Sequence, residues 1–357
     1  MEAAFNIIIN KILTAGAKQR ASNVHLTVGA YPTLRIDEEL VELKDEQIIT
    51  NDFVTKLAQD WLDEFQQKKL LEKKEIIFIK EVAKQFRVKV NFFFQKGFLS
   101  ASLRLIPAQV PPIINLGLPK SVYGLTDKKA GLIIVTGPYG SGRTTTVASI
   151  IEEINKSRKE NIITVEEPIE YLFVNKESLI EQREVGRDVN SFTDALRYCQ
   201  QADIDVVAIG VTGEKETIPL VLEFANSGRL AILTMETTSA IQTIEEIFSS
   251  FSAEQQQRAP LLLSESLLAI ITQRVVPKVG GGQVLAAEVL IANEAVRSLI
   301  REGRIKQINT ILQSSRAEGM LSLDQSLAEL VRSGEVLIDQ AIEYANDPQN
   351  FRAMAKG

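Results

Sequence analysis

Apolar and polar residues follow different periods along the first hundred positions of the chain. Residues 3–20 carry apolar side chains near helical spacing, which predicts an amphipathic helix, and the run 24–28 alternates as a half-buried strand does. Further on, apolar positions recur every four residues and predict one face of a single long helix: Phe53, Leu57, Trp61 and Phe65. From 75 to 106 the period becomes two, which predicts strands. We therefore expect a small α+β domain over residues 1–107.

Prolines are concentrated between residues 107 and 120, where they interrupt regular structure and stiffen the chain, so we expect a linker over residues 108–120. Beyond this linker, four continuous apolar runs predict buried strands at 132–135, 162–165, 206–209 and 230–233. Helical patterns between these runs start near Arg143, Ser191, Glu214 and Ser239. Strands of this kind between helices predict a mainly parallel sheet covered on both faces, within a second domain over residues 121–357 that ends in several helices.

Composition narrows the class of protein. The 357 residues are 45% hydrophobic and 24% charged, as in a soluble globular protein of two domains, which excludes a disordered chain and a disulfide-rich miniprotein. The net charge of −6 disfavours a broad nucleic-acid surface, so we expect no nucleic-acid partner. The single cysteine, Cys199, permits no internal disulfide, and no apolar stretch approaches the length of a membrane span. We expect a cytoplasmic protein.

A glycine-rich segment between the strand 131–136 and the next predicted helix, 145–155, is the strongest chemical signal. Its residues are Gly137, Pro138, Tyr139, Gly140, Ser141, Gly142, Arg143 and Thr144, followed by Thr145. This is the context of a P-loop, in which backbone N–H groups converge on phosphate oxygens at a helix N-terminus. We expect it to bind ATP, with the Thr144 hydroxyl on Mg²⁺. Arg143 stands where a lysine is usual and brings a bulkier, planar cation. The alternative is a strand–helix turn without a ligand.

Carboxylates at the ends of the neighbouring strands are needed to hold magnesium or to position water. The strand 162–165 ends in Glu166 and Glu167, which we take as candidate catalytic residues; a solvated turn is the alternative. The strand 206–209 should carry a second acid, but Val211 stands at its tip. We expect Glu214 to open the next helix and point to solvent, and the end of the strand 230–233, which includes Glu236, offers nothing that evidently completes a hydrolytic site.

Together these segments resemble the PilT-like type IV pilus retraction ATPases, a branch of the secretion ATPases. The matches occur in order over nearly the whole chain, at 21–26, 86–88, 104–107, 137–144, 163–170, 182–185, 264–267, 280–282 and 295–302. The resemblance implies a hexameric ring of two-domain subunits, each with an N-terminal PAS-like domain and a RecA-like P-loop domain, with ATP bound between the two. It also implies that Glu166 is the glutamate of the family's Asp box and that Arg87 and Arg104 reach the phosphates; a polar strand face is the alternative for the two arginines.

Several departures from the family pattern fall on its chemistry. Arg143 replaces the P-loop lysine and Glu167 the Asp-box aspartate. Val211 replaces the Walker B glutamate, and Arg229 and Glu236 replace the two histidines of the His box. We therefore expect a retraction ATPase subunit that binds ATP but hydrolyses it weakly or not at all. Its expected partners are an active PilT-like paralogue and the platform protein of the inner membrane at the pilus base. A fully active motor with variant residues and a scaffold subunit that binds no nucleotide are the alternatives.

Overall fold

The structure is a computed structural model that describes residues 2–37, 39–83 and 86–356, with side chains from residue 6 onward. The chain divides into two compact units, Met1–Gln109 and Val110–Gly357. Each unit has its own sheet and its own hydrophobic core. No helix among the described residues is both long enough and apolar enough to cross a membrane.

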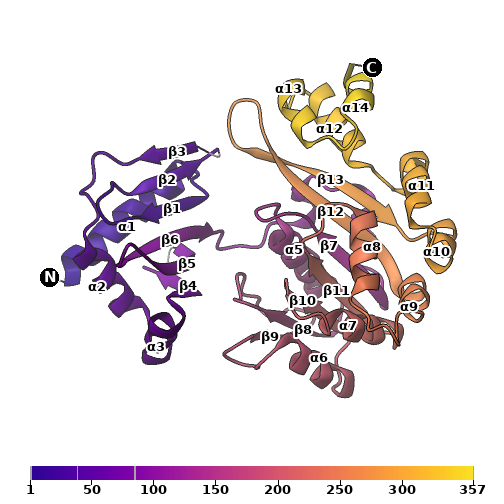
Figure 1. Cartoon of the computed structure of the whole chain (residues 1–357), viewed down its shortest axis with the longest axis horizontal. Helices are drawn as coiled ribbons and strands as arrows, with labels where there is room; N and C mark the ends of the chain where they lie inside the picture. The colour runs from indigo at the N-terminus through magenta and orange to yellow at the C-terminus, as the bar shows by residue number, and fades with distance from the viewer. Residues whose placement is uncertain (1, 38, 84–85, 357) are drawn as a thin grey trace. The chain divides into compact units, whose positions relative to one another are not determined.

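The first unit is built on a six-stranded antiparallel sheet in the order β3-β2-β1-β6-β5-β4 (Figure 1). Its strands are β1 (Asn23–Leu26), β2 (Thr33–Ile36), β3 (Glu39–Glu42), β4 (Glu75–Val82), β5 (Phe86–Gln95) and β6 (Phe98–Ile106). Its helices are α1 (Glu2–Lys18), α2 (Asn51–Trp61) and α3 (Glu64–Lys73). Leu13 of α1, Leu57 of α2 and Val90 of β5 lie in one fully buried cluster. The α+β character expected from the sequence is therefore confirmed.

The prediction of one long helix through residue 65 is wrong, because two helices occupy this region. α2 ends at Trp61, and α3 begins after Asp63, whose carboxylate accepts a hydrogen bond from the Gln66 backbone N–H at 2.8 Å. The Gln66 side chain accepts in turn from the Asp63 N–H at 3.1 Å, which completes a capping box. Phe65, expected on the buried face, is 66% exposed. The capping box at Asp63 therefore starts a new helix, although the apolar spacing alone would continue the first one.

The second unit is built on a seven-stranded sheet in the order β13-β12-β7-β11-β10-β8-β9. Its strands are β7 (Gly131–Thr136), β8 (Asn161–Glu166), β9 (Leu179–Glu184), β10 (Val206–Ile209), β11 (Leu230–Met235), β12 (Leu267–Pro277) and β13 (Gln283–Ile291). All neighbouring pairs are parallel except β12–β13, which forms a hairpin. The mainly parallel sheet agrees with the sequence prediction, whereas no strand was predicted at β9.

Helices cover both faces of this sheet because alternate strand residues point in opposite directions. Leu132 and Ile134 of β7 pack with α6 (Phe192–Gln201), α7 (Thr217–Asn226), α8 (Ala240–Ser249), α9 (Ala259–Ser266) and α10 (Glu294–Arg301). Ile133 and Val135 pack instead with α5 (Arg143–Ser157), η1 (Ile113–Leu116) and α4 (Lys120–Tyr123). Because helices bury both faces of the sheet, every residue of β7, β10 and β11 is buried, which explains their continuous apolar runs.

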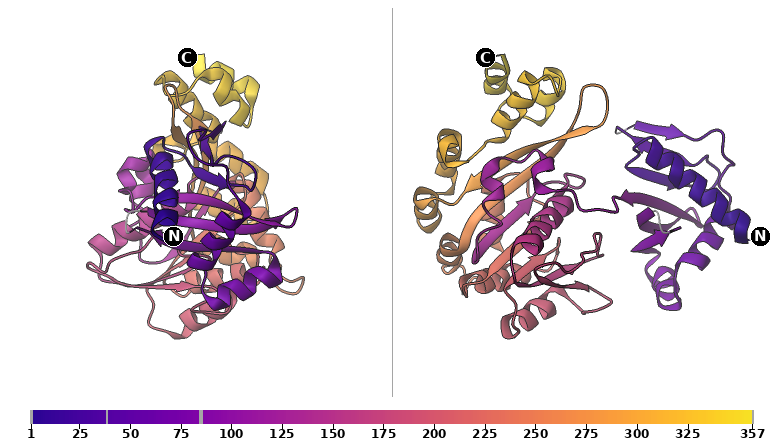
Figure 2. Two further views of the ribbon diagram at one scale, coloured as in Figure 1. Left: turned by 90° about the vertical axis from the view of Figure 1, so that its left-hand side faces the viewer. Right: turned by 180° about the vertical axis from the view of Figure 1, so that it is seen from behind.

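The chain closes with short helices beyond α10. These are η2 (Ile305–Gln307), α11 (Ile308–Ser314), η3 (Arg316–Glu318), α12 (Leu323–Arg332), α13 (Ile338–Ala341), η4 (Ile342–Tyr344) and α14 (Pro348–Lys356). Leu327 of α12 and Phe351 of α14 form a separate small core with Val276 and Ala286 of the β12–β13 hairpin. Figure 2 shows these helices, in yellow, beside the orange hairpin in the view from behind.

Candidate functional site

The glycine-rich segment forms a tight turn from β7 into α5 whose backbone only glycine adopts easily. Gly137, Gly140 and Gly142 have φ values of +148°, +81° and +86°. A Cβ atom on Gly137 would lie 2.5 Å from both the Gln273 carbonyl oxygen and the Ser141 Oγ, so a side chain here would clash with β12 and with the turn itself. At Gly140 and Gly142 a Cβ atom would meet no atom within 4 Å, so glycine is favoured there only because of the positive φ angle.

Hydrogen-bond donors at this turn have no acceptor among the described residues. Gly142 precedes α5 without any side-chain cap, and the first N–H groups of a helix have no intrahelical acceptor. The Ser141 hydroxyl is buried and has no hydrogen-bond partner within the described part of the chain. Because the helix dipole adds positive potential at the same place, this geometry fits a phosphate group. Tyr139, at the outer side of the turn, is 76% exposed.

Arg143, the first residue of α5, turns away from solvent and reaches the neighbouring strand. Its Nη1 donates to the Met235 carbonyl oxygen at 2.6 Å, and its Nη2 donates to Glu236 Oε1 at 3.0 Å. The arginine side chain is 9% exposed and that of Glu236 is 60% exposed. The cation of the predicted P-loop is thus bound to a carboxylate of the same chain, a partnership that sequence reasoning missed.

This partnership follows from the strand order, which the sequence does not contain. β11, which ends at Met235, is paired with β7 through Met235↔Thr136, so Glu236 is next to the turn that starts at Gly137. β8, which ends at Glu166, is separated from β7 by β11 and β10. The strand directly beside the P-loop is thus the one that ends in Glu236, whose contact with Arg143 was not predicted from the sequence.

Two further contacts fix α5 against its surroundings. Gln273 on β12 donates to Thr146 Oγ1 at 2.7 Å, inside the buried layer between helix and sheet. On the other side, the hydroxyls of Thr145 and Tyr171 are 3.1 Å apart, so the loop that follows β8 returns to the start of α5. These contacts bring together the P-loop, the end of β11 and the loop after β8. Thr144, the second residue of α5, is half-buried.

Glu166 is half-buried at the end of β8 and is bound to neutral partners. Its Oε1 accepts from Thr164 Oγ1 at 2.8 Å and from Gln182 Nε2 at 3.5 Å. Burial raises its pKa to about 7, against these two hydrogen bonds, which lower it. A carboxyl group that titrates near neutral pH can both take up and release a proton. Glu167, next along the chain, is exposed.

The end of β10 carries no carboxylate that could join Glu166. Val211 is 41% exposed there. Glu214, expected to open a helix and point to solvent, instead lies ahead of α7 and caps α6. It accepts from the backbone N–H of Phe192 at 3.2 Å and from the N–H and hydroxyl of Thr193 at 3.0 and 2.7 Å. Burial alone would raise the pKa of Glu214, but these hydrogen bonds hold it below its usual value.

The remaining candidate residues lie elsewhere in the chain. Arg87 on β5 and Arg104 on β6 belong to the first unit, where they are half-buried on strands whose alternate residues, such as Val88 and Leu103, are fully buried. Arg229 stands at the opposite end of β11 from Glu236, where it donates to the carbonyl oxygens of Cys199 and Gln200. Arg229 therefore holds the end of α6, at the edge of the sheet away from the P-loop.

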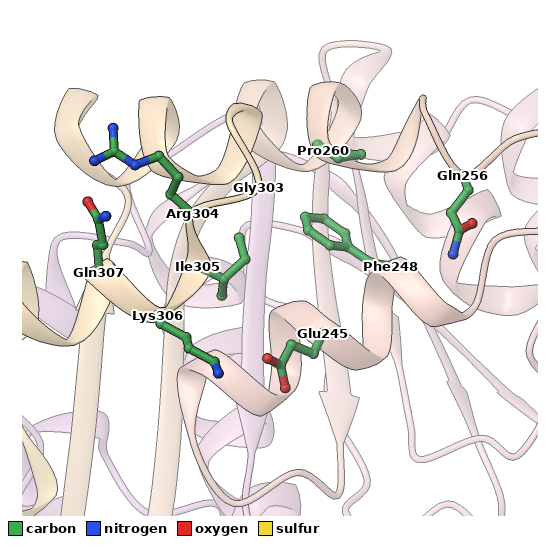
Figure 3. A pocket seen from close by; sticks show the side chains of 9 residues that line it. All are labelled: Glu245, Phe248, Gln256, Pro260, Gly303, Arg304, Ile305, Lys306 and Gln307. Atoms are coloured by element: carbon green, nitrogen blue, oxygen red, sulfur yellow. The ribbon is translucent and has the colours of Figure 1, made fainter.

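A cavity of about 580 Å³ lies in another part of the second unit, between α8, α9 and the turn after α10 (Figure 3). Phe248, Pro260 and Ile305 form its apolar part, and Arg304 and Lys306 stand at its rim. None of the P-loop residues lines it, so this cavity and the phosphate-fitting turn are separate features. Among the described residues, no group of three or more His, Cys, Asp or Glu is placed to hold a metal ion.

The comparisons with known proteins agree on one family. Residues 2–282 match the family model described as Type II/IV secretion system protein. The chain is 36% identical to the type IV pilus retractation ATPase PilT of Pseudomonas aeruginosa, over 96% of this chain and 99% of that protein. It is 29% identical to the type IV pilus ATPase PilU of the same organism, over 97% of this chain and 91% of PilU.

A solved structure extends this likeness to three dimensions. The crystal structure of the pilus retraction motor PilT with bound ADP has a TM-score of 0.84 and 40% sequence identity, and the match covers 96% of this chain and 98% of that one. It confirms the predicted fold class, an N-terminal α+β domain followed by a RecA-like P-loop domain. The chain therefore belongs to the Type II/IV secretion system protein family, as a PilT-like secretion ATPase.

Proposed function

We propose that this chain is a ring-forming subunit of a type IV pilus retraction motor that binds nucleotide but hydrolyses ATP weakly or not at all. The observation that carries the proposal is the state of Arg143. It belongs to a turn that keeps its glycines and its free donors, yet its guanidinium is bound to Glu236 and to the Met235 carbonyl oxygen. A phosphate cradle without an available cation favours binding over catalysis, since phosphoryl transfer depends on charge placed against the γ-phosphate.

The second support is the missing carboxylate at the end of β10. Val211 has no group that can hold magnesium or orient water, and Glu214 is already bound to the start of α6. Glu166 remains as the group that positions water, with Glu167 beside it. Magnesium would be held by the Thr144 hydroxyl together with the phosphates, because magnesium needs few protein ligands when phosphates are present.

The proposed assembly is a homohexamer, or a ring that works with an active PilT-like paralogue at the cytoplasmic side of the pilus base, against the platform protein of the inner membrane. Arg87 and Arg104 would contribute to nucleotide sites of that ring from the first unit. The chain is similar to both PilT and PilU, two type IV pilus ATPases of the same organism, and this supports a role beside a paralogue. Rigid-body rotation within a ring can transmit motion that a neighbouring subunit powers.

The test separates binding from turnover in the purified protein. Binding of ATP and ADP is measured by calorimetry, and single-turnover hydrolysis is measured with the protein in excess over magnesium-ATP. We expect saturable binding with slow turnover. The double variant Arg143→Lys/Val211→Glu should hydrolyse ATP faster than either single variant, because each change restores one electrostatic contact worth on the order of 100-fold in rate.

Other outcomes select the alternatives. Wild-type turnover at the rate of a functional retraction ATPase measured alongside it would select an active motor with variant residues. Absence of binding at millimolar ATP and ADP would select the scaffold. In the organism that carries the gene, Glu166→Ala should leave pilus retraction largely intact while deletion of the gene weakens it. A Glu166→Ala strain as defective as the deletion strain would show that hydrolysis in this chain is required.

A further inference from the structure

We propose that Glu236 determines nucleotide specificity: its carboxylate, held by Arg143, makes the site favour a nucleoside diphosphate over a triphosphate. The inference rests on the proposed function, since it concerns the same P-loop. It assigns a role to Glu236, a residue that lies outside the P-loop segment 137–144.

The first step concerns which part of a nucleotide each half of the site serves. In a P-loop the backbone N–H groups of the turn cradle the α- and β-phosphates, whereas the side-chain cation reaches the β- and γ-phosphates. Here the turn keeps the positive φ values at Gly140 and Gly142, the uncapped start of α5 and the buried Ser141 hydroxyl. The groups of the turn that cradle the α- and β-phosphates are therefore in place.

The second step concerns the cation. Arg143 directs Nη1 to the Met235 carbonyl oxygen at 2.6 Å and Nη2 to Glu236 Oε1 at 3.0 Å, and its side chain is 9% exposed. A γ-phosphate that reached this guanidinium would have to replace Glu236, or would lie beside its negative charge. Like charges within a few ångströms repel each other, so the added charge of a triphosphate is penalised at this position.

The third step concerns why the ion pair keeps this geometry. The Arg143 side chain passes against β11 and is anchored by a main-chain carbonyl that no rotamer change can move. Glu236 directly follows Met235, so the same strand end supplies both acceptors to the planar fork. Glu236 is 60% exposed, so its charge is accessible to solvent and salt. In Glu236→Gln the amide oxygen can still accept from Arg143, which also keeps its hydrogen bond to the Met235 carbonyl oxygen.

The experiment measures dissociation constants for ADP and for a non-hydrolysable ATP analogue, by calorimetry at low and at high salt. The wild-type chain should bind ADP more tightly. Glu236→Gln should lower the ratio of the analogue's constant to the ADP constant by roughly tenfold, mainly by tightening the analogue. The ratio in the wild-type chain should also fall as salt rises, because salt screens an exposed carboxylate.

The matched control is Glu246→Gln, which removes the same charge from the exposed side of α8 and should leave the ratio unchanged. Glu236→Ala should act like Glu236→Gln, which separates charge from side-chain length. ADP binding with an unchanged ratio in both Glu236 variants would overturn this inference and leave the proposed function standing. If neither nucleotide binds to the wild-type chain or to the variants, both the inference and nucleotide binding by this chain are refuted.

Discussion

Two glutamates stand at the carboxyl edge of the same sheet, and their surroundings give them different properties. Glu236, at the end of β11, is 60% exposed and accepts from the Arg143 guanidinium. Glu166, at the end of β8, is half-buried and its side chain accepts from the neutral groups of Thr164 and Gln182, with a pKa raised to about 7. One carboxylate neutralises a cation, whereas the other can exchange a proton near neutral pH.

The difference shows that position at a strand end does not by itself define a role. Parallel strands bring both side chains to one edge, but the strand order β7-β11-β10-β8 puts Glu236 beside the P-loop and Glu166 three strands away. Burial raises the pKa of Glu166 against its hydrogen bonds from Thr164 and Gln182, whereas Glu236 is exposed and bound to the Arg143 guanidinium.

The largest effect should come from a side chain placed in the glycine-rich turn, beside the end of β11 that carries Glu236. Gly137→Val places side-chain atoms where a Cβ already lies 2.5 Å from the Gln273 carbonyl oxygen, at a φ of +148°. We expect the free energy of unfolding to fall by more than about 3 kcal/mol and nucleotide binding to be lost. Denaturant unfolding and calorimetry measure the two quantities.

The control for this change is Gly140→Ala, which has a φ of +81° but no atom within 4 Å of its Cβ position. It should cost only about 1 kcal/mol, from backbone strain alone. Equal losses for the two variants would mean that strain, and not contact with β12, makes Gly137 necessary.

The next effect concerns the pH dependence of stability at the Glu166 end. The pKa of the Glu166 carboxyl is about 7 in the folded protein and 4.5 in the unfolded chain, so the folded protein stays protonated at this group up to a higher pH. Its contribution to stability is present below about pH 4.5 and is lost as the pH rises through 7, by at most about 3 kcal/mol. Glu166→Gln should remove this loss, which unfolding curves between pH 4.5 and pH 8 measure. If the free energy of unfolding of Glu166→Gln fell with rising pH as steeply as that of the wild-type chain, the raised pKa of Glu166 would be contradicted.

A smaller effect should follow from removing one of the neutral partners of Glu166. Thr164→Val keeps the shape of a buried side chain but deletes the hydroxyl that donates to Glu166 at 2.8 Å and lowers its pKa. We expect the pKa of Glu166 to rise further, by about one unit. Carbon-13 chemical shifts of the Glu166 carboxyl, followed against pH, report this directly; a fall in the pKa would show that the hydrogen bond favours the neutral acid.

The smallest effect on stability should come from the ion pair itself. Glu236→Gln removes the charge of the partner that is 60% exposed, where solvent screens the attraction and limits its contribution to roughly 1 kcal/mol. The amide oxygen can still accept from Arg143, so the free energy of unfolding should change little while the nucleotide preference changes. A loss above about 2 kcal/mol, measured by denaturant unfolding, would assign the pair a structural role and weaken the contrast between the two strand ends.

Local patterns in the chain were sufficient to predict the central strands, the P-loop and the Glu166 strand end. Continuous apolar runs predicted β7, β8, β10 and β11 within a residue or two, and glycine spacing predicted the turn at 137–142. The break between α2 and α3 was missed because a capping box at Asp63 interrupts an apolar repeat that continues past it. That error was also local, and the Asp63–Gln66 spacing could have revealed it.

The residues that meet at the site could be known only from the folded chain. Arg143 and Glu236 are 93 positions apart, and Glu214 caps a helix that begins 22 positions before it. Such pairings depend on strand order and on which loop returns to which helix, and neither leaves a periodic trace in the chain. The sequence therefore identified the kinds of groups at the candidate phosphate site. The fold determined that one of its glutamates holds the P-loop cation, since side chains distant along the chain become neighbours only through the sheet.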